Sequence, residues 1–177
     1  GMAFPDARPL FGRRVASGGM SNLERDPQEL VSVQDRHPDG AAPAVEVLAP
    51  REVPLGGPRA LLVRRTLPQR RRSLIGAWCF VDSYGPTPAP RHGVMDTPPH
   101  PHTGLQTVSW LYEGQIEHRD STGAHQLIDP GAVNLMTAGR GIQHSEVSTT
   151  AAATLHGVQL WTALPDAARD ARPFFEH

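Results

Sequence analysis

The chain has 177 residues, of which 38% are hydrophobic, with 17 basic and 18 acidic residues and a formal net charge of −1 at pH 7. This length suits one domain with a useful core, and the near-neutral charge excludes a global field that would draw the protein to nucleic acid or an anionic membrane. The 18 prolines and 17 glycines favour short elements and many turns, which predicts an all-β fold.

A cytoplasmic location is the simplest expectation from the sequence. The single cysteine, Cys79, gives no sign of an oxidising compartment, and we interpret it as a small buried core residue. No apolar run approaches the ~20 residues of a membrane span, and no secretory signal is recognisable.

Residues 1–42 are predicted to form an irregular arm, because prolines, Gly18-Gly19 and scattered charges interrupt them. A short helix is expected around residues 22–33, where Asp26-Pro27 could supply a cap and a first-turn proline. A second short helix is expected at 166–172, within a C-terminal tail of residues 166–177.

Between the arm and the tail, short runs rich in β-branched, aromatic and apolar residues predict strands. The predicted strands are 44–48, 60–63, 77–81, 105–112, 115–120, 124–128, 132–136, 142–147 and 155–161, with a proline-rich loop at 84–99. Turn signals at 113–114, 120–123, 129–131 and 139–141 predict a series of antiparallel hairpins. One such hairpin is expected between 105–112 and 115–120.

The segment 64–72 contains five arginines in nine residues. One interpretation is a patch for nucleic acid or an acidic partner. We favour the other, a solvated hairpin connection around Pro68, because the overall charge is not basic.

Two short motifs bracket the hairpin series, His100-Pro101-His102 and His144-Ser145-Glu146. Alternate side chains of a strand point to the same face, so each motif offers two ligand atoms together. The intervening strands can bring the two motifs onto facing walls of one barrel. The sequence therefore predicts a four-ligand metal site.

Three imidazoles and one carboxylate suit Fe, Mn, Ni, Cu or Zn, and suit a structural zinc site poorly because such sites usually recruit thiolates. Four protein ligands around a six-coordinate ion would leave positions for water, substrate or dioxygen. Among the four, only Glu146 could also act as a base that takes a proton from the substrate.

These motifs closely resemble the amino-terminal cupin domain of the pirin family, over roughly residues 53–165. The resemblance is carried by the segments His100–Gly104, Glu117–Ser121, Met136–Glu146 and Leu155–Trp161. It implies a jelly-roll β-barrel in a cupin domain at 43–165. It also implies a metal site, with Fe(II) the expected ion, at His100, His102, His144 and Glu146.

The resemblance further implies a quercetin 2,3-dioxygenase type of activity, as in bacterial pirins, with Glu146 as the catalytic base. The alternative is a non-catalytic, redox-responsive metal-binding regulator of a protein partner or of transcription, as in eukaryotic pirins. Pirins have a second cupin after the first, and the sequence ends at His177, before such a domain would begin. Because that barrel covers the first, we expect a homodimer here to cover the apolar surface otherwise left open.

His118 and His156 are the other histidines on predicted strands. Each could line the pocket, and we interpret both as structural or solvent-exposed instead.

Overall fold

The computed structural model describes residues 46–55, 61–88, 95–151 and 153–177, and in these ranges the chain forms eleven strands and no helix. The strands are β1 (Arg51–Leu55), β2 (Leu61–Leu67), β3 (Trp78–Pro88), β4 (Asp96–His102), β5 (Leu105–Glu113), β6 (Ile116–Asp120), β7 (His125–Ile128), β8 (Asn134–Thr137), β9 (Ile142–Ser148), β10 (Thr154–Ala163) and β11 (Phe174–Glu176). No helix in these ranges has the length and apolar character needed to cross a bilayer.

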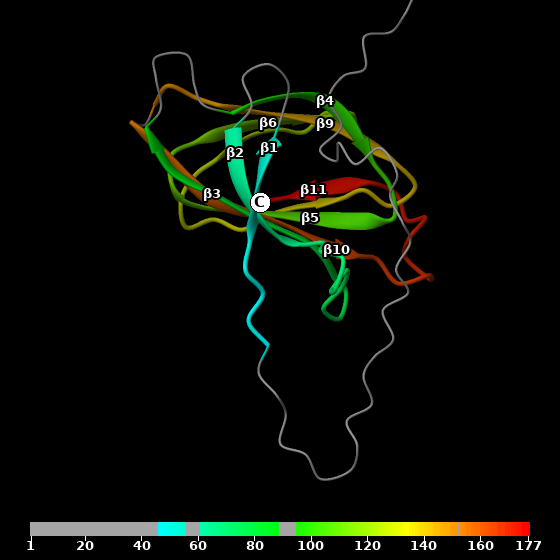
Figure 1. Cartoon of the computed structure of the whole chain (residues 1–177). Coiled ribbons are helices and arrows are strands. Elements are labelled where there is room, and N and C mark those ends of the chain that lie inside the picture. The colour runs from blue at the N-terminus through cyan, green and yellow to red at the C-terminus, as the bar shows by residue number, and fades with distance from the viewer. Residues whose placement is uncertain (1–45, 56–60, 89–94, 152) are drawn as a thin grey trace, which may run out of the picture.

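The strands form two antiparallel sheets. The larger has the order β1-β2-β3-β10-β5-β8-β11, and the smaller has the order β4-β9-β6-β7. Figure 1 shows β4, β6 and β9 along one side of the molecule and β3, β5 and β10 along the other. Two facing antiparallel sheets with crossing connections are the architecture of a jelly roll, so the predicted all-β class is confirmed.

The core lies between the two sheets. Its main cluster combines Leu61, Val63 and Leu111 of the larger sheet with Ile116 and Ile128 of the smaller one. Strand β2 shows the cause, since its alternate residues are buried and exposed in turn, as expected for a strand with one face on a core. A second, smaller cluster of Met136, Ala138 and Ile142 fills the end where β8 passes into β9.

The hairpin predicted between 105–112 and 115–120 is wrong. Strand β5 pairs with β10 and β8, whereas β6 pairs with β7 and β9 in the other sheet. The turn at Glu113-Gly114 therefore carries the chain from one sheet to the other. Of the four predicted turns, only the one at 120–123 joins two paired neighbours, β6 and β7. A turn residue shows that the chain reverses, and tertiary packing decides which strand it then meets.

Several element boundaries also differ from the prediction. The chain at 46–50 is not a strand. Strand β1 begins at Arg51, where its pairing with β2 begins. Strand β3 continues to Pro88 into the predicted loop, because β10 pairs with its whole length. Cys79 is half-buried rather than buried. The arm and its predicted helix lie outside the described residues.

The predicted terminal helix at 166–172 is also wrong. Residues 166–170 form turns, and the chain continues into β11, which pairs with β8. Ala171 O accepts a hydrogen bond from Arg140 N at 3.0 Å, which ties the tail to the turn before β9. The tail therefore completes the larger sheet instead of forming a separate helix.

The arginine-rich segment is only partly a solvated connection. Arg65 lies within β2, is 2% exposed, and forms two 2.8 Å bonds with the carboxylate of Asp82 on β3. Its guanidinium also lies 4.3 Å from the centre of the Phe80 ring. The inward position on β2 is what buries Arg65, and Asp82 at the paired position of β3 makes that burial tolerable.

Candidate metal centre

The two histidine motifs lie on adjacent strands of the smaller sheet. His100 and His102 are on β4, His144 and Glu146 are on β9, and His100 pairs with His144 in register. The prediction that the motifs occupy facing walls is therefore wrong. Neighbouring strands bring the side chains together more directly, because paired residues point to the same face of the sheet.

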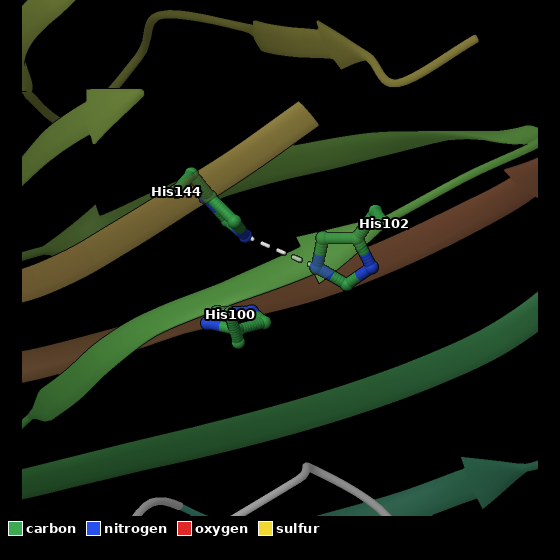
Figure 2. Close-up of side chains that lie close together, drawn as sticks. All are labelled: His100, His102 and His144. Atoms are coloured by element: carbon green, nitrogen blue, oxygen red, sulfur yellow. Dashed lines mark hydrogen bonds between the residues drawn. The ribbon is translucent and has the colours of Figure 1, made fainter. Parts of the chain in front are cut away.

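Three of the four predicted ligands converge. His100, His102 and His144 each offer a ring nitrogen, and these atoms lie within 4.8 Å of one another. The Nε2 atoms of His102 and His144 are 3.1 Å apart, and Figure 2 shows the three rings turned toward a common point. Two ligands at about 2.0–2.1 Å from one ion would be separated by roughly 3.0–3.4 Å. The 3.1 Å separation of these two nitrogens thus fits a shared metal ion.

The histidines are also oriented from outside the cluster. His100 Nδ1 donates to Pro98 O at 2.9 Å, which leaves its Nε2 for a metal. His144 Nδ1 lies 3.4 Å from His118 Nδ1, and His118 Nε2 lies 3.0 Å from Asp120 Oδ2. Hydrogen bonds of this kind to the second ring nitrogen fix the orientation of metal-binding histidines.

Burial keeps the imidazoles neutral at pH 7. Together with the charge repulsion of the neighbouring histidines, it lowers the pKa of His102 to about 4 and that of His144 to about 2. Burial also lowers the pKa of His100, although the hydrogen bond to Pro98 opposes this effect. Neutral imidazole is the form that binds a metal, so the donor set fits such an ion without first losing a proton.

Glu146 is buried on the same face of β9 as His144, two residues further along. Burial raises the pKa of this carboxyl to about 7, and a hydrogen bond with Ser109 on β5 opposes the rise. The compact cluster in the described residues consists of the three histidines. Glu146 as a fourth ligand stays a prediction, as does metal binding itself.

Two buried side-chain donors have no hydrogen-bond partner in the described part of the chain. They are the Tyr84 hydroxyl and the Trp161 indole N–H. The Trp161 ring packs edge-on against His102, with centroids 4.8 Å apart. Burial and the charge of Glu146 raise the pKa of Tyr84, so its hydroxyl remains a donor. An unmade bond at a buried donor costs about 1–3 kcal/mol, so these groups are suited to an additional polar ligand.

His118 was predicted to be structural or solvent-exposed. It is 2% exposed and adjoins His144, so it is not solvent-exposed, and the structural alternative stays a prediction. The overlooked signal is the spacing of His118 and Asp120, the same alternate-residue spacing as in the two recognised motifs. His156 is half-buried beside the exposed Tyr112 ring, in line with its predicted role.

This fold and site define a cupin-type jelly-roll protein with a histidine cluster on the inner face of one sheet. The family model described as Pirin matches residues 60–162. The chain belongs to the pirin family.

Named relatives agree with this assignment. The chain is 44% identical over 158 residues to the Pseudomonas aeruginosa protein named "Putative quercetin 2,3-dioxygenase PA1205", covering 89% of this chain and 49% of the relative. It is 41% identical over 121 residues to a pirin-like protein of Caulobacter vibrioides, covering 65% of this chain and 42% of the relative.

A solved structure shows the same likeness. The crystal structure of a quercetin 2,3-dioxygenase from Acinetobacter baumannii superposes with a TM-score of 0.70 at 47% identity, over 73% of this chain and 42% of that one. The chain thus spans about half the length of the relatives it matches.

Proposed function

We propose that this chain is a metal-binding pirin-like cupin that acts as an iron-dependent dioxygenase on a flavonol-like substrate. The observation that carries the proposal is the cluster of three neutral imidazoles, with ligand atoms within 4.8 Å of one another. The names of the relatives from Pseudomonas aeruginosa and Acinetobacter baumannii support the substrate class.

The residues around the cluster suit a hydroxylated aromatic substrate. His100, His102 and His144 would hold the iron, which supplies Lewis-acid and redox chemistry when bound. The unpartnered indole N–H of Trp161 would bind a substrate oxygen, since its ring packs against His102. It also favours an oxygen-rich ligand over an apolar one, which would leave this donor unpaired.

Glu146 would remove the proton of the substrate hydroxyl. Its carboxylate lies on the same buried face as His144, and its backbone lies on the interior strand β9. His144 and Glu146 are buried, and low exposure to water would strengthen electrostatic contacts with the deprotonated substrate.

The proposal is tested by the loss of flavonol absorbance in air. We expect turnover with Fe(II)-loaded protein and none with metal-free protein. Metal uptake without turnover would exclude the dioxygenase and would favour the redox-responsive regulator. Absence of both metal uptake and turnover would reject the proposed function as a whole.

Replacing Glu146 with Gln is expected to lower flavonol turnover by about 100-fold or more, the scale on which a general base contributes. Gln keeps the shape and a carbonyl oxygen but cannot accept the substrate proton. The measurement is the rate per bound metal. The matched control is Glu113→Gln, the same substitution at an exposed position of β5, and its turnover is expected to be unchanged. Unchanged turnover in metal-loaded Glu146→Gln protein would remove this residue from the mechanism.

A further inference from the structure

We propose that His118 and Asp120 are positioning residues that hold His144 in the tautomer and orientation in which its Nε2 can bind a metal. The inference rests on the proposed metal site. It adds an outer layer, meaning residues of a third strand that contact a metal ligand without binding the metal themselves. The two residues lie on β6, which pairs with β9 on the side away from β4.

The pairing of β6 with β9 places these side chains beside the site. His118 is opposite Glu146, and Asp120 is opposite His144. Opposite residues in an antiparallel pair share a face of the sheet, so His118 and Asp120 point to the side on which the ligands lie. Both side chains are buried, with exposures of 2% and 0%.

The carboxylate of Asp120 is held by the turn that follows it. Its Oδ1 accepts from Thr122 N at 2.8 Å, from Thr122 Oγ1 at 2.6 Å and from Ala124 N at 3.3 Å. Ser121 in turn is bound to β9, since its amide donates to Gln143 O at 2.8 Å. The second oxygen, Oδ2, is left to face His118 at 3.0 Å. The turn therefore fixes where the acceptor for His118 lies.

The positions of the protons follow from this acceptor. A carboxylate only accepts, so His118 Nε2 carries the proton and its Nδ1 is an acceptor. His144 Nδ1, at 3.4 Å, must then be the donor. A neutral imidazole has one proton, so His144 Nε2 keeps a free lone pair. That nitrogen is the one that faces His102 Nε2.

The His118 ring is also fixed by packing. It stacks on Phe175 of β11, with centroids 4.3 Å apart and 21° between the planes. Hydrogen bonds on two edges and an aromatic ring on one face leave the His118 ring little freedom to turn. Such outer partners of metal-binding histidines typically contribute about 10–100-fold to metal affinity.

The experiment measures zinc affinity by competition with a chelator. His118→Phe keeps a flat ring against Phe175 and removes the acceptor for His144. Asp120→Asn keeps an oxygen for the turn and places an amide donor against His118, which drives His118 toward the wrong tautomer. Each variant is expected to bind zinc about 10–100-fold more weakly than the wild type. His125→Phe is the matched control, because His125 is half exposed and bonds Glu117 instead. Its affinity is expected to be unchanged.

A double-mutant cycle tests whether Asp120 acts through His118. In the His118→Phe background, Asp120→Asn is expected to cause no further loss of affinity. Two losses that multiply would show independent action and overturn the proposal, as would single variants within about twofold of the wild type.

Nitrogen NMR of the zinc-loaded wild type reads the tautomers directly. We expect the proton of His144 on Nδ1 and that of His118 on Nε2. A proton on His118 Nδ1 would overturn the inference even if His118→Phe failed to fold. Wild-type protein that binds zinc while the variants bind equally well would reject this inference and leave the metal site standing. Wild-type protein that takes up no zinc would reject both.

Discussion

His102→Ala and His144→Ala proteins are expected to lose most of their metal and to keep their fold. Each substitution removes one of the ring nitrogens that converge within 4.8 Å. The loss of metal affinity should therefore exceed the loss of about 10–100-fold that is typical when a hydrogen-bond partner of a ligand is replaced. The main core cluster contains neither histidine, so packing between the sheets persists. Elemental analysis gives the occupancy, and circular dichroism gives the fold.

His156→Ala is the matched control for these two variants. His156 is half-buried on β10 against the ring of Tyr112, away from the cluster, and its replacement should leave metal occupancy unchanged. Full occupancy in both His102→Ala and His144→Ala would contradict the proposed site.

Replacing either Arg65 or Asp82 with Ala is expected to lower the free energy of unfolding by about 3–5 kcal/mol, the usual cost of leaving one partner of a buried ion pair uncompensated. The guanidinium and carboxylate are 3% and 1% exposed and 2.8 Å apart, so water cannot replace the lost partner. Urea unfolding at pH 7 measures the change. Arg64→Ala on the exposed face of β2 is the control, with an expected change within about 0.5 kcal/mol. A loss below about 1 kcal/mol for Asp82→Ala would contradict the expectation.

The difference in the free energy of unfolding between wild type and Arg65→Ala protein is expected to become smaller as the pH falls. Burial raises the pKa of Asp82, and Arg65 opposes this rise, so removing Arg65 raises that pKa further. A carboxyl whose pKa is higher in the folded than in the unfolded state destabilises the fold above its unfolded pKa, and protonation relieves that cost. Urea unfolding of wild type and variant at pH 7 and pH 5 measures the difference. A larger difference in the free energy of unfolding at pH 5 than at pH 7 would contradict this expectation.

The sequence by itself determined the all-β fold class and which of the predicted metal ligands share a strand face. Alternating burial in strands such as β2 and β9 follows directly from alternating residue types, because the strand period of two is local. The same local rule predicts that His100 and His102 share a face, and that His144 and Glu146 do too. The pirin resemblance and the all-β class were both confirmed.

Only the tertiary structure decided which strands meet. The turn at Glu113-Gly114 leads to the other sheet, because β5 is already paired on both of its edges, with β8 and with β10. The burial of Arg65 depended on Asp82, which lies 17 residues away on the neighbouring strand. His118 joined the site because β6 pairs with β9. Pairing is a long-range choice made by the summed packing of both sheets, and no local pattern of residues contains it.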